Sequence, residues 1–362
     1  MGDFNGTAFA VTAERLSEVL GADIVTVDPQ RIGDGLVGMN LRVGLTYAPG
    51  GDGPASVVIK LPSEDPLSRR SGIELRNYER EVRFYGEVAS TVAIRTPRCF
   101  HAEWNPDDGE FAVVLEDMAP ARQGDQITGC SVAMAEAAVV ELARLHAPRW
   151  GDSSLDAIEW LSRRTGDDDV VRLEQMYVIF WPGFLATYGP HLDAEQIALG
   201  ERVGTMLRQW LDARRSPFTV VHGDYRLDNL LFAGAGEMPA APGAPPRQIT
   251  GVAAVDWQTP GHGPGIADLS YFLGAGLLVD DRRAHERDLV RAYLAELAAM
   301  GVELDESECW QQYRRETLAG IVMSVIASQV VGRTERSEAM FTAMATRHLR
   351  HALDLDSLGA LL

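Results

Sequence analysis

Three polar side chains in the second half of the chain have the types and the spacing needed for metal-assisted chemistry. Asp224 and Asn229 stand five residues apart in "HGDYRLDNLLF", and Asp256 ends the apolar strand-like run "VAAVD". Apolar runs on both sides of a short polar loop hold its side chains rigidly, as a catalytic carboxylate requires. Mg²⁺ prefers hard oxygen ligands and takes few of them from protein. An acid, an amide and a second acid in this order therefore suit a base and a magnesium pair.

A single basic residue of the first third also stands out. The chain has 33 Lys and Arg residues, and Lys60 in "SVVIKLP" is the only lysine, which leaves 33 − 1 = 32 arginines. A lysine at the end of a strand is usually an exposed surface charge. Arg and Lys are not interchangeable where a compact, flexible point charge is needed, so the one retained lysine predicts a specific role.

The two motifs together resemble a known group of enzymes. "HGDYRLDNLLF" followed by "VDWQTPGHGPGIADLSYFL" is similar to the aminoglycoside phosphotransferase and choline kinase group of the protein-kinase-like fold. The resemblance implies an ATP-dependent small-molecule kinase that binds ATP and Mg²⁺ between two lobes. It implies Asp224 as the base toward a substrate hydroxyl, with Asn229 and Asp256 as magnesium ligands. In the same comparison His222 orients the loop, and Asp268 is the buried acid that braces it.

Other residues of the motifs separate the chain from protein kinases. The sequence has "HGD" and "DWQ" where protein kinases have "HRD" and "DFG", and no "A-P-E" segment follows Asp256. These departures point away from protein substrates. Arg226 stands two residues after Asp224, where many protein kinases place a phosphate-contacting lysine, and we expect it to contact the transferred phosphoryl group.

The resemblance also gives Lys60 a function. A strand lysine of the kinase pattern holds the α- and β-phosphates and is itself held by a glutamate of the following helix. The segment after Lys60 offers Glu74, Glu79 and Glu81. We predict Glu81, because it opens an "E-x-x-F-Y" run similar to that of the family. Glu79 would face roughly 200° around the helix, and it remains the alternative.

Two further stretches are candidates for nucleotide contacts. Gly33, Gly35 and Gly38 form a G-x-G-x-x-G between two predicted strands, and such a loop can lie over phosphates through its backbone N–H groups. A plain hairpin turn is the alternative. In "VVLEDM" the backbone groups of Glu116 to Met118 resemble the hinge that pairs with the adenine edge.

The predicted fold class is α+β, with a β-rich N-terminal lobe and a mainly helical C-terminal lobe. Residues 1–117 form the nucleotide-binding lobe and 118–362 the catalytic and substrate-binding lobe, with a Gly/Ala/Pro-rich surface insert at 233–247. In the first lobe the alternation and turn residues predict five strands and one crossing helix over 74–89. The strands are expected at 23–32, 39–48, 55–62, 98–104 and 111–118. Helical periodicity predominates from Ser131 onward.

Two other features of the sequence are candidates for core packing or for ligand binding. His146 lies on the apolar face of a predicted helix and is expected to be a core histidine. The aromatic run from Met176 to Tyr188 has the helical spacing of core residues. In the resembling group this region helps to form the acceptor pocket, so Tyr177, Trp181 and Phe184 are alternative pocket residues.

Composition limits the range of partners. The net charge is 33 − 52 = −19 and the pI is about 4.8, so a nucleic-acid partner is not expected. The longest apolar runs are too short to span a bilayer. Three dispersed cysteines and the absence of a signal-peptide pattern at the start suit a soluble cytoplasmic protein.

The acceptor is left open by the sequence. An aminoglycoside, an amino alcohol and a hydroxyacyl thioester all fit the resembling family. The alternative to an enzyme is a pseudokinase that binds a nucleotide without turnover. The oligomeric state and the choice between ATP and GTP are not fixed by the sequence.

Overall fold

The computed structural model describes residues 9–33, 38–161, 166–215, 217–234 and 251–362. Gly35 and most of the predicted insert at 233–247 therefore lie outside the described residues. The chain forms two compact units. The first consists of Met1–Ser90, Thr96–Ala119 and Asp256–Thr259, and the second of Thr91–Arg95, Pro120–Val255 and Pro260–Leu362.

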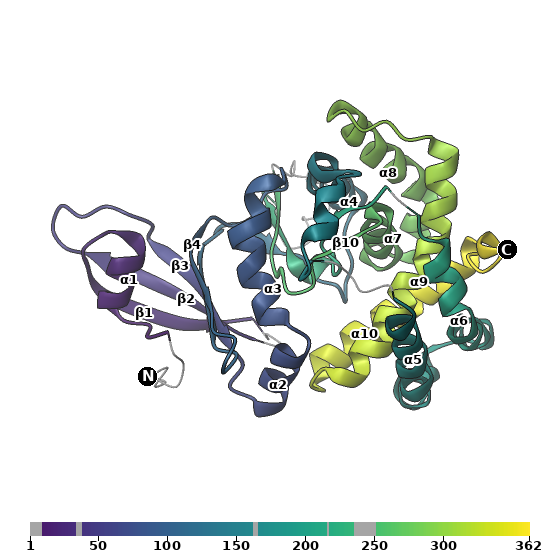
Figure 1. Cartoon of the computed structure of the whole chain (residues 1–362), viewed down its shortest axis with the longest axis horizontal. Coiled ribbons are helices and arrows are strands. Elements are labelled where there is room, and N and C mark those ends of the chain that lie inside the picture. Colours follow the sequence, from purple (N-terminus) through teal and green to yellow (C-terminus); the bar gives the residue numbers. More distant parts are fainter. Residues whose placement is uncertain (1–8, 34–37, 162–165, 216, 235–250) are drawn as a thin grey trace, which may run out of the picture. The chain divides into compact units, whose positions relative to one another are not determined.

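The first unit is built on a five-stranded antiparallel sheet in the order β1-β2-β3-β5-β4 (Figure 1). All five strands predicted from the sequence are present, which confirms the β-rich N-terminal part of the predicted fold. Their bounds are β1 Ile24–Ile32, β2 Gly38–Tyr47, β3 Ser56–Pro62, β4 Cys99–Trp104 and β5 Phe111–Glu116.

The two faces of this sheet are covered differently. On one face Leu41 and Ile59 pack with Leu16 of α1 (Ala13–Leu20) in an apolar cluster. On the other face Tyr78 of α3 (Asn77–Arg83) packs with Val113 and with the side chain of Val58. Successive residues of a strand point to opposite faces, so Lys60, two residues after Val58, lies on the α3 face.

The helical segment of the first unit differs from the single helix predicted over 74–89. The structure has α2 (Pro66–Glu74), a break, α3, and then a π-helical turn at Phe84–Val88. Asp65 caps α2 by accepting the Ser68 N–H at 2.8 Å, and Pro66 has the φ that a first helical residue needs. Arg76 has φ 60, a left-handed conformation that ends a helix. The prediction was wrong in the start and the continuity of this helix.

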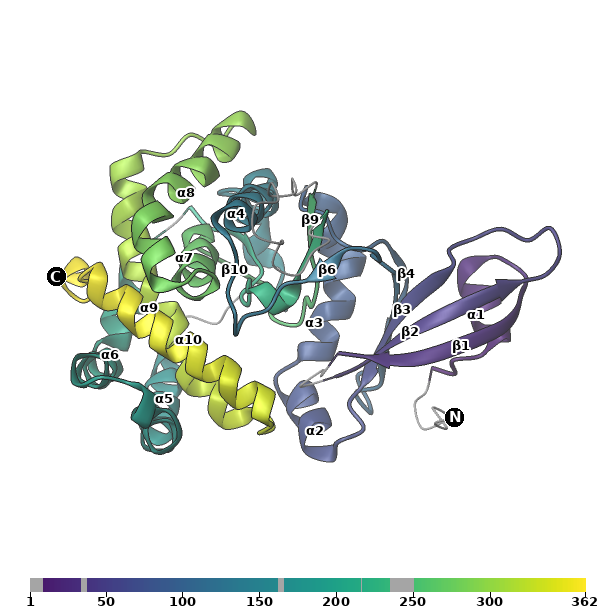
Figure 2. The same ribbon diagram turned by 180° about the vertical axis from the view of Figure 1, so that it is seen from behind.

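The second unit is mainly helical, as expected of the C-terminal part (Figure 2). The helix α7 packs against α9, α4 packs against α8, and α10 lies along α9. Short strands form two small sheets, β7 with β10, and β6-β8-β9. The helices are α4 Val132–His146, α5 Asp167–Tyr188, α6 Ala194–Ala213, α7 Gly265–Gly276, α8 Val279–Ala299, α9 Glu306–Val330 and α10 Glu335–Asp354. The strands are β6 Arg122–Gln123, β7 Thr219–Val221, β8 Leu230–Ala233, β9 Gly251–Ala254 and β10 Gly261–Gly263.

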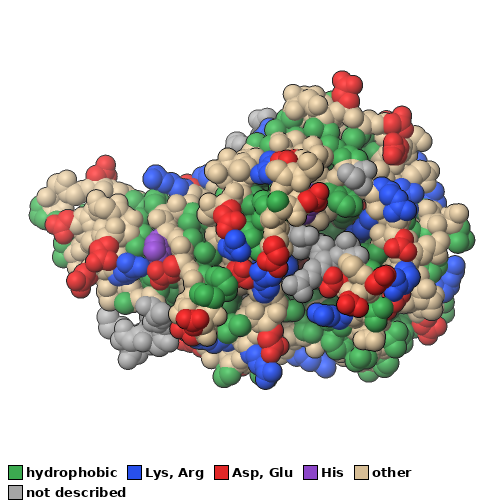
Figure 3. All heavy atoms as spheres, in the orientation of Figure 1, with side chains coloured by type: hydrophobic (Ala, Val, Ile, Leu, Met, Phe, Trp, Pro, Cys, Tyr) green, Lys and Arg blue, Asp and Glu red, His purple; other side chains and the backbone are tan. Residues whose placement is uncertain are grey.

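The surface mixes charges of both signs. On the face drawn in Figure 3, carboxylates and basic side chains are interspersed. Along the described part of the chain, no helix has both the length and the apolar character that crossing a membrane requires.

Candidate active site

Lys60 is the centre of a charged cluster in the first unit. Its Nζ lies 2.6 Å from Glu81 Oε1 and 2.7 Å from Asp256 Oδ1. The Glu81 side chain is fully buried, whereas that of Asp256 is 35% exposed. Glu79 instead accepts bonds from Arg76 and Arg83, at 2.7 and 3.3 Å. The glutamate of α3 that pairs with Lys60 is therefore Glu81.

The protonation states of this cluster follow from burial and charge. Burial alone would lower the pKa of Lys60, but the attraction of Asp256 and Glu81 raises it above its ordinary value. Burial raises the pKa of Glu81, and the attraction of Lys60 opposes that rise. Gln258 Nε2 donates to the second oxygen of Glu81 at 3.2 Å. The cluster holds one ammonium group between two carboxyl groups, and Asp256 is the more accessible of the two.

The segment that carries Asp256 is fixed to the first unit by packing. Asp256 has φ 67, a left-handed conformation that costs about 1–3 kcal/mol for a residue other than glycine. The adjacent Trp257 is fully buried and stacks on Phe84, with ring centroids 3.8 Å apart and planes 6° apart. This stack and the Gln258–Glu81 bond hold the strained residue in place.

The two described glycines of the G-x-G-x-x-G motif lie at the ends of the β1–β2 connection. Gly33 follows β1 with φ 66, and Gly38 opens β2. A Cβ on Gly38 would lie 3.2 Å from the Leu61 carbonyl oxygen, so β2 and β3 approach closely there. The connection joins two paired antiparallel strands, which is compatible with both the hairpin and the phosphate-loop interpretations.

The predicted hinge begins at the end of β5. The Glu116 N–H donates to the Arg98 carbonyl at 2.8 Å, and its carboxylate accepts the Arg98 N–H at 2.9 Å. Asp117 accepts from Ser56 and from the Ala119 N–H, at 2.6 and 3.1 Å. The Glu116 N–H is already bonded, so it is not the donor that a base would meet in the 116–118 segment.

In the second unit, Asp224 is held by three donors. Arg226 Nε and Asn229 Nδ2 each donate to Oδ2 at 3.0 Å, and the Tyr271 hydroxyl donates to Oδ1 at 2.8 Å. Tyr271 is a member of this cluster that the sequence did not single out. The carboxylate is thus oriented through both of its oxygens, as a base that must accept a proton in one geometry requires.

The backbone of the same loop is fixed by Asp268. Its carboxylate accepts the N–H groups of His222 and Gly223 at 2.6 and 3.0 Å. His146 Nε2 lies 3.4 Å from the same carboxylate. Burial would raise the pKa of Asp268, but these hydrogen bonds and the neighbouring histidines lower it. His146 is fully buried, as expected of a core histidine, but it also contacts the acid that holds the loop.

Arg226 lies between two carboxylates. Its Nη1 donates to Asp228 Oδ2 at 2.6 Å, in addition to the bond from Nε to Asp224. Asp228 in turn accepts from the Gln126 N–H and from Arg336, at 3.0 and 3.2 Å. Burial would lower the pKa of Arg226, but Asp224 and Asp228 raise it. The guanidinium remains charged, and its charge is already compensated by acids of its own loop.

The side chains of Asn229 and Asp256 carry the kind of oxygen ligand that Mg²⁺ prefers. Asn229 uses Nδ2 for Asp224, so its Oδ1 is the atom that could coordinate a cation, and Asp256 offers a partly exposed carboxylate. Within the described ranges, no three or more His, Cys, Asp or Glu side chains are grouped so that they could hold a metal ion. Each of the two side chains offers an oxygen ligand, and Mg²⁺ usually takes few ligands from protein and the rest from water and phosphates.

The aromatic run of α5 belongs to the core. Tyr177 and Phe184 are each 1% exposed, and Trp181 stacks on both, with centroids 5.8 and 5.3 Å apart. The core packing expected from the helical spacing is confirmed for Tyr177 and Phe184, and their burial does not favour the alternative that they line an open pocket.

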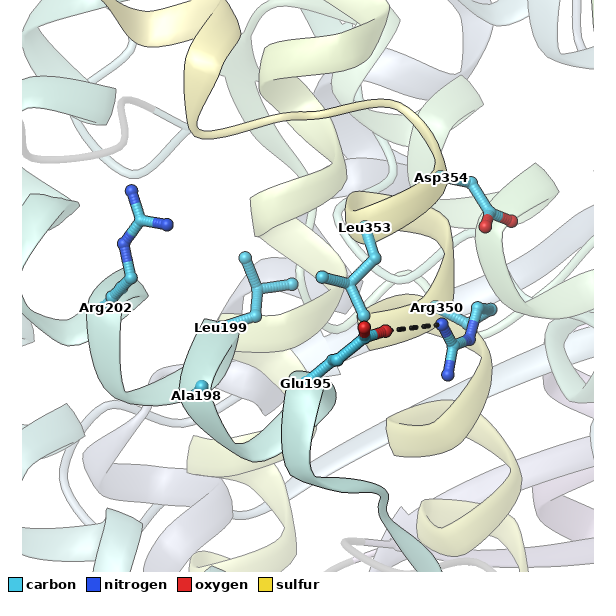
Figure 4. Close-up of a pocket in the computed structure, with 7 residues that line it drawn as sticks. All are labelled: Glu195, Ala198, Leu199, Arg202, Arg350, Leu353 and Asp354. Carbon is cyan, nitrogen blue, oxygen red and sulfur yellow. Dashed lines mark ion pairs between the residues drawn. The ribbon is translucent and has the colours of Figure 1, made fainter.

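A separate hollow of about 500 Å³ lies on the second unit between α6 and α10 (Figure 4). Glu195 of α6 points toward Arg350 of α10, and the two form an ion pair at 3.6 Å. Asp354 at its edge pairs with Arg283 at 2.8 Å. The hollow contains none of the predicted catalytic residues.

Comparisons with known proteins show which proteins the chain is similar to. A model of the ecdysteroid kinase-like family matches residues 173–305, which include both motifs. No curated protein matches the chain. The chain is similar to a choline kinase from Cryptosporidium parvum Iowa II, with TM-score 0.58 and 10% identity over 92% of this chain and 91% of that one.

Two nucleotide complexes are also similar. The GDP complex of aminoglycoside 2′-phosphotransferase-IIIa has TM-score 0.52 and 12% identity over 93% of this chain and 94% of that one. A spectinomycin phosphotransferase in complex with ADP and spectinomycin has TM-score 0.51 and 12% identity over 96% and 100%. These likenesses confirm the predicted fold, which the chain shares with a choline kinase and with two antibiotic phosphotransferases.

Proposed function

We propose that the protein is an ATP-dependent phosphotransferase that moves the γ-phosphoryl group to a hydroxyl of a small molecule. The observation that carries the proposal is the arrangement of Asp224, whose two oxygens are fixed by Arg226, Asn229 and Tyr271. A carboxylate held in this way is suited to accept the proton of an attacking hydroxyl. The motif resemblance and the shared fold support the same reaction class.

The residues of the first unit would bind the nucleotide. Lys60, kept protonated by its two carboxylates, would contact the α- and β-phosphates, and the loop from Gly33 to Gly38 would offer backbone N–H groups to phosphate oxygens. Asn229 and Asp256 would hold Mg²⁺. When bound, the ion would neutralise charge on the phosphate oxygens.

The chemical step is an in-line displacement. The acceptor oxygen forms a bond to the γ-phosphorus, the bond to the β–γ bridging oxygen breaks, and ADP leaves with that bond's electron pair. The proton of the acceptor hydroxyl passes to Asp224. The protein contributes positioning and electrostatic stabilisation rather than covalent chemistry. Arg226 would keep the Asp224 carboxylate oriented and, as proposed from the motif, approach the phosphoryl group.

The acceptor class stays broad within this proposal. The structures that share the fold include a choline kinase and a spectinomycin complex, so a small hydroxylated or amino-alcohol acceptor is compatible with the fold. A hydroxyacyl thioester is the third candidate. Both an ADP complex and a GDP complex occur among the similar structures, so the nucleotide is tested together with the acceptor.

The test is nucleotide turnover with Mg²⁺ across a pooled acceptor library, with ATP and GTP in parallel. Asp224→Asn keeps the size of the side chain and removes the base. We expect acceptor-dependent ADP release to fall by about 10²- to 10⁴-fold, which is the usual contribution of general-base catalysis. Asp288→Asn is the control, because this exposed acid pairs with the exposed Arg291. The control variant loses the same charge as Asp224→Asn.

The turnover of the two proteins tests the assignment of Asp224 as the base and the assignment of the chain as an enzyme. Equal turnover of Asp224→Asn and wild type contradicts the assignment of the base. If wild type binds ATP and shows no turnover with any acceptor of the library, either the library lacks the acceptor or the result favours a non-catalytic nucleotide-binding module.

A further inference from the structure

We propose that Tyr271 is a positioning residue that sets the plane of the Asp224 carboxylate, and that His348 holds the Tyr271 ring from behind. The inference rests on the proposed function, since it concerns the residue assigned as the base. It adds two side chains, on α7 and α10, that the motifs do not assign to the reaction.

Tyr271 provides the contact on the second oxygen of the base. Arg226 and Asn229 both donate to Oδ2, whereas the Tyr271 hydroxyl donates to Oδ1 at 2.8 Å. The χ2 torsion of an aspartate has a broad distribution, so donors to one oxygen alone leave the carboxylate free to rotate. A hydrogen bond to the other oxygen removes that freedom. Bonds to ionised acceptors are also the stronger ones.

The position of Tyr271 on α7 links it to the brace of the loop. Asp268 and Tyr271 are three residues apart on one helix, so their side chains lie on the same face. Asp268 holds the backbone of His222 and Gly223, and Tyr271 holds the side chain of the next residue, Asp224. One face of α7 thus fixes the loop backbone and the reactive group together.

His348 of α10 stacks on the Tyr271 ring. The ring centroids are 5.2 Å apart and the planes 21° apart. His348 is fully buried, and among the described residues neither of its ring nitrogens has a hydrogen-bond partner. Burial without partners costs about 1–3 kcal/mol per polar group. The contact of the ring with Tyr271 is made through its flat face.

The neighbouring helices leave a slot for this ring. A Cβ on Gly274 of α7 would lie 2.8 Å from His348 Nδ1, and a Cβ on Gly320 of α9 would overlap the ring. Two glycines on two different helices therefore admit the imidazole. The ring is therefore closely packed against the backbones of α7 and α9 at these two glycines.

The experiment compares Tyr271→Phe with Tyr177→Phe in the full chain. Tyr177 is also buried, and its hydroxyl donates to the Gly200 carbonyl at 2.9 Å, so its variant loses a similar buried bond remote from the base. We expect Tyr271→Phe to lower kcat roughly 10- to 100-fold, as misplacement of a reacting group does. The KM for nucleotide should change less than about twofold, because Lys60 and the first unit bind the nucleotide. Tyr177→Phe should keep kcat within about twofold of wild type.

A second pair of variants tests His348. His348→Ala removes the wall behind Tyr271 and should lower kcat, and His348→Phe should restore most of the loss because it keeps a flat ring. The inference is overturned if Tyr271→Phe keeps the wild-type kcat, if nucleotide KM rises in the same proportion as kcat falls, or if His348→Phe is no better than His348→Ala.

The design separates this inference from the proposed function. Loss of turnover in Asp224→Asn but not in Tyr271→Phe supports the function and rejects the inference. If wild type transfers no phosphoryl group to any acceptor, the function fails. Crystal structures of wild type and Tyr271→Phe then decide the inference. A rotated Asp224 carboxylate in the variant supports it, and an unchanged one rejects it.

Discussion

At the scale of single residues, Lys60 of the first unit is a buried cation that is paired with two carboxylates. Of these two, Glu81 has no exposure to solvent. Removing one partner of a buried ion pair is costly because it leaves an uncompensated charge, whereas replacing both partners is often tolerated. The loss of stability caused by substituting Lys60 therefore depends on whether a buried carboxylate is left without a counter-charge.

Lys60→Met should lower the free energy of unfolding at pH 7 by about 3–5 kcal/mol, because Glu81 loses its counter-charge. Adding Glu81→Gln should recover part of that loss, since the buried charge is then absent. Urea unfolding of wild type, both single variants and the double variant measures the coupling. A double variant that is no more stable than Lys60→Met would contradict this account of the cluster.

His348 gives the stability a dependence on pH. Burial lowers its pKa to about 3, and His351, Arg347 and Arg282 act in the same direction. The unfolded chain binds a proton at this residue below about pH 6.5, whereas the folded chain does not until about pH 3. Because the unfolded state then binds more protons, stability is complete above pH 6.5 and is lost as the pH falls toward 3.

Below pH 6.5, protonation of His348 in the unfolded chain lowers the free energy of unfolding by about 1.4 kcal/mol per pH unit. Between pH 6.5 and 5, wild type should therefore lose about 2 kcal/mol more than His348→Phe, which has no titrating ring. Chemical denaturation at both pH values measures the difference. Identical losses of unfolding free energy in the two proteins would show that His348 is protonated as readily in the folded state as in the unfolded state. Buried His351, whose pKa burial also lowers, is present in both proteins and cancels.

At the scale of elements, α7 packs so closely against α9 and α10 that substitutions are limited by shape. Gly320 lies in the interior of α9, where alanine would ordinarily favour the helix by about 1 kcal/mol. The added Cβ would, however, overlap the His348 ring. That ring is fully buried and cannot move aside freely.

Gly320→Ala should therefore lower the midpoint of thermal unfolding, with a net cost of about 1–3 kcal/mol as in other overpacked cores. The same substitution in a His348→Ala background should be neutral or stabilising, because the overlapping atoms are gone. Thermal scans of the four proteins measure the coupling. Additive effects would place the His348 ring away from Gly320.

Several elements followed directly from the sequence, and others had no local signal. The five strands were predictable because each is a short run rich in apolar or β-branched residues, and turn residues separate the runs. The start of α2 also had a signal, Asp65 followed by Pro66, which the apolar periodicity of the following residues obscured. The break at Arg76 had none, since arginine rarely adopts a left-handed conformation.

The site was predictable to a similar extent. Asp224, Asn229 and Asp256 could be found because their spacing is a motif. The choice of Glu81 over Glu79 followed from a short run of neighbouring residues. The contact of Tyr271 with Asp224 could not be found, because it joins residues 47 positions apart through the packing of α7. The same holds for Asp228, whose partners beyond its own loop, Gln126 and Arg336, come from two other segments.

At the scale of the whole molecule, the proposed site residues are divided between the two units. Lys60, Glu81 and Asp256 belong to the first unit, whereas Asp224 and Asn229 belong to the second. The linear division predicted at residue 117 did not assign Asp256–Thr259 to the first unit. The packing of Trp257 on Phe84 and the bond from Gln258 to Glu81 account for this assignment.

This division predicts different effects of variants on nucleotide binding. A ligand at 100 times its Kd stabilises the folded state by about 2.7 kcal/mol. Asp224→Asn should keep most of the thermal stabilisation by Mg²⁺–ATP, because it leaves the first unit intact, and Lys60→Met should lose most of it. Thermal shifts of each protein with and without nucleotide measure both effects. An equal loss in the two variants would contradict the assignment of nucleotide binding to the first unit.

Because the chain has a single lysine, chemical labelling of amines can measure the exposure of Lys60 directly. An acylating reagent reacts with a free amine, and each unit by which a pKa rises reduces the free amine about tenfold. Lys60, buried and with a raised pKa, should be acylated more than about tenfold more slowly in the folded protein than in urea. Mass spectrometry of the peptide that contains residue 60 would then follow the opening of the β3–α3 cluster, with no engineered probe and no competing side-chain amine.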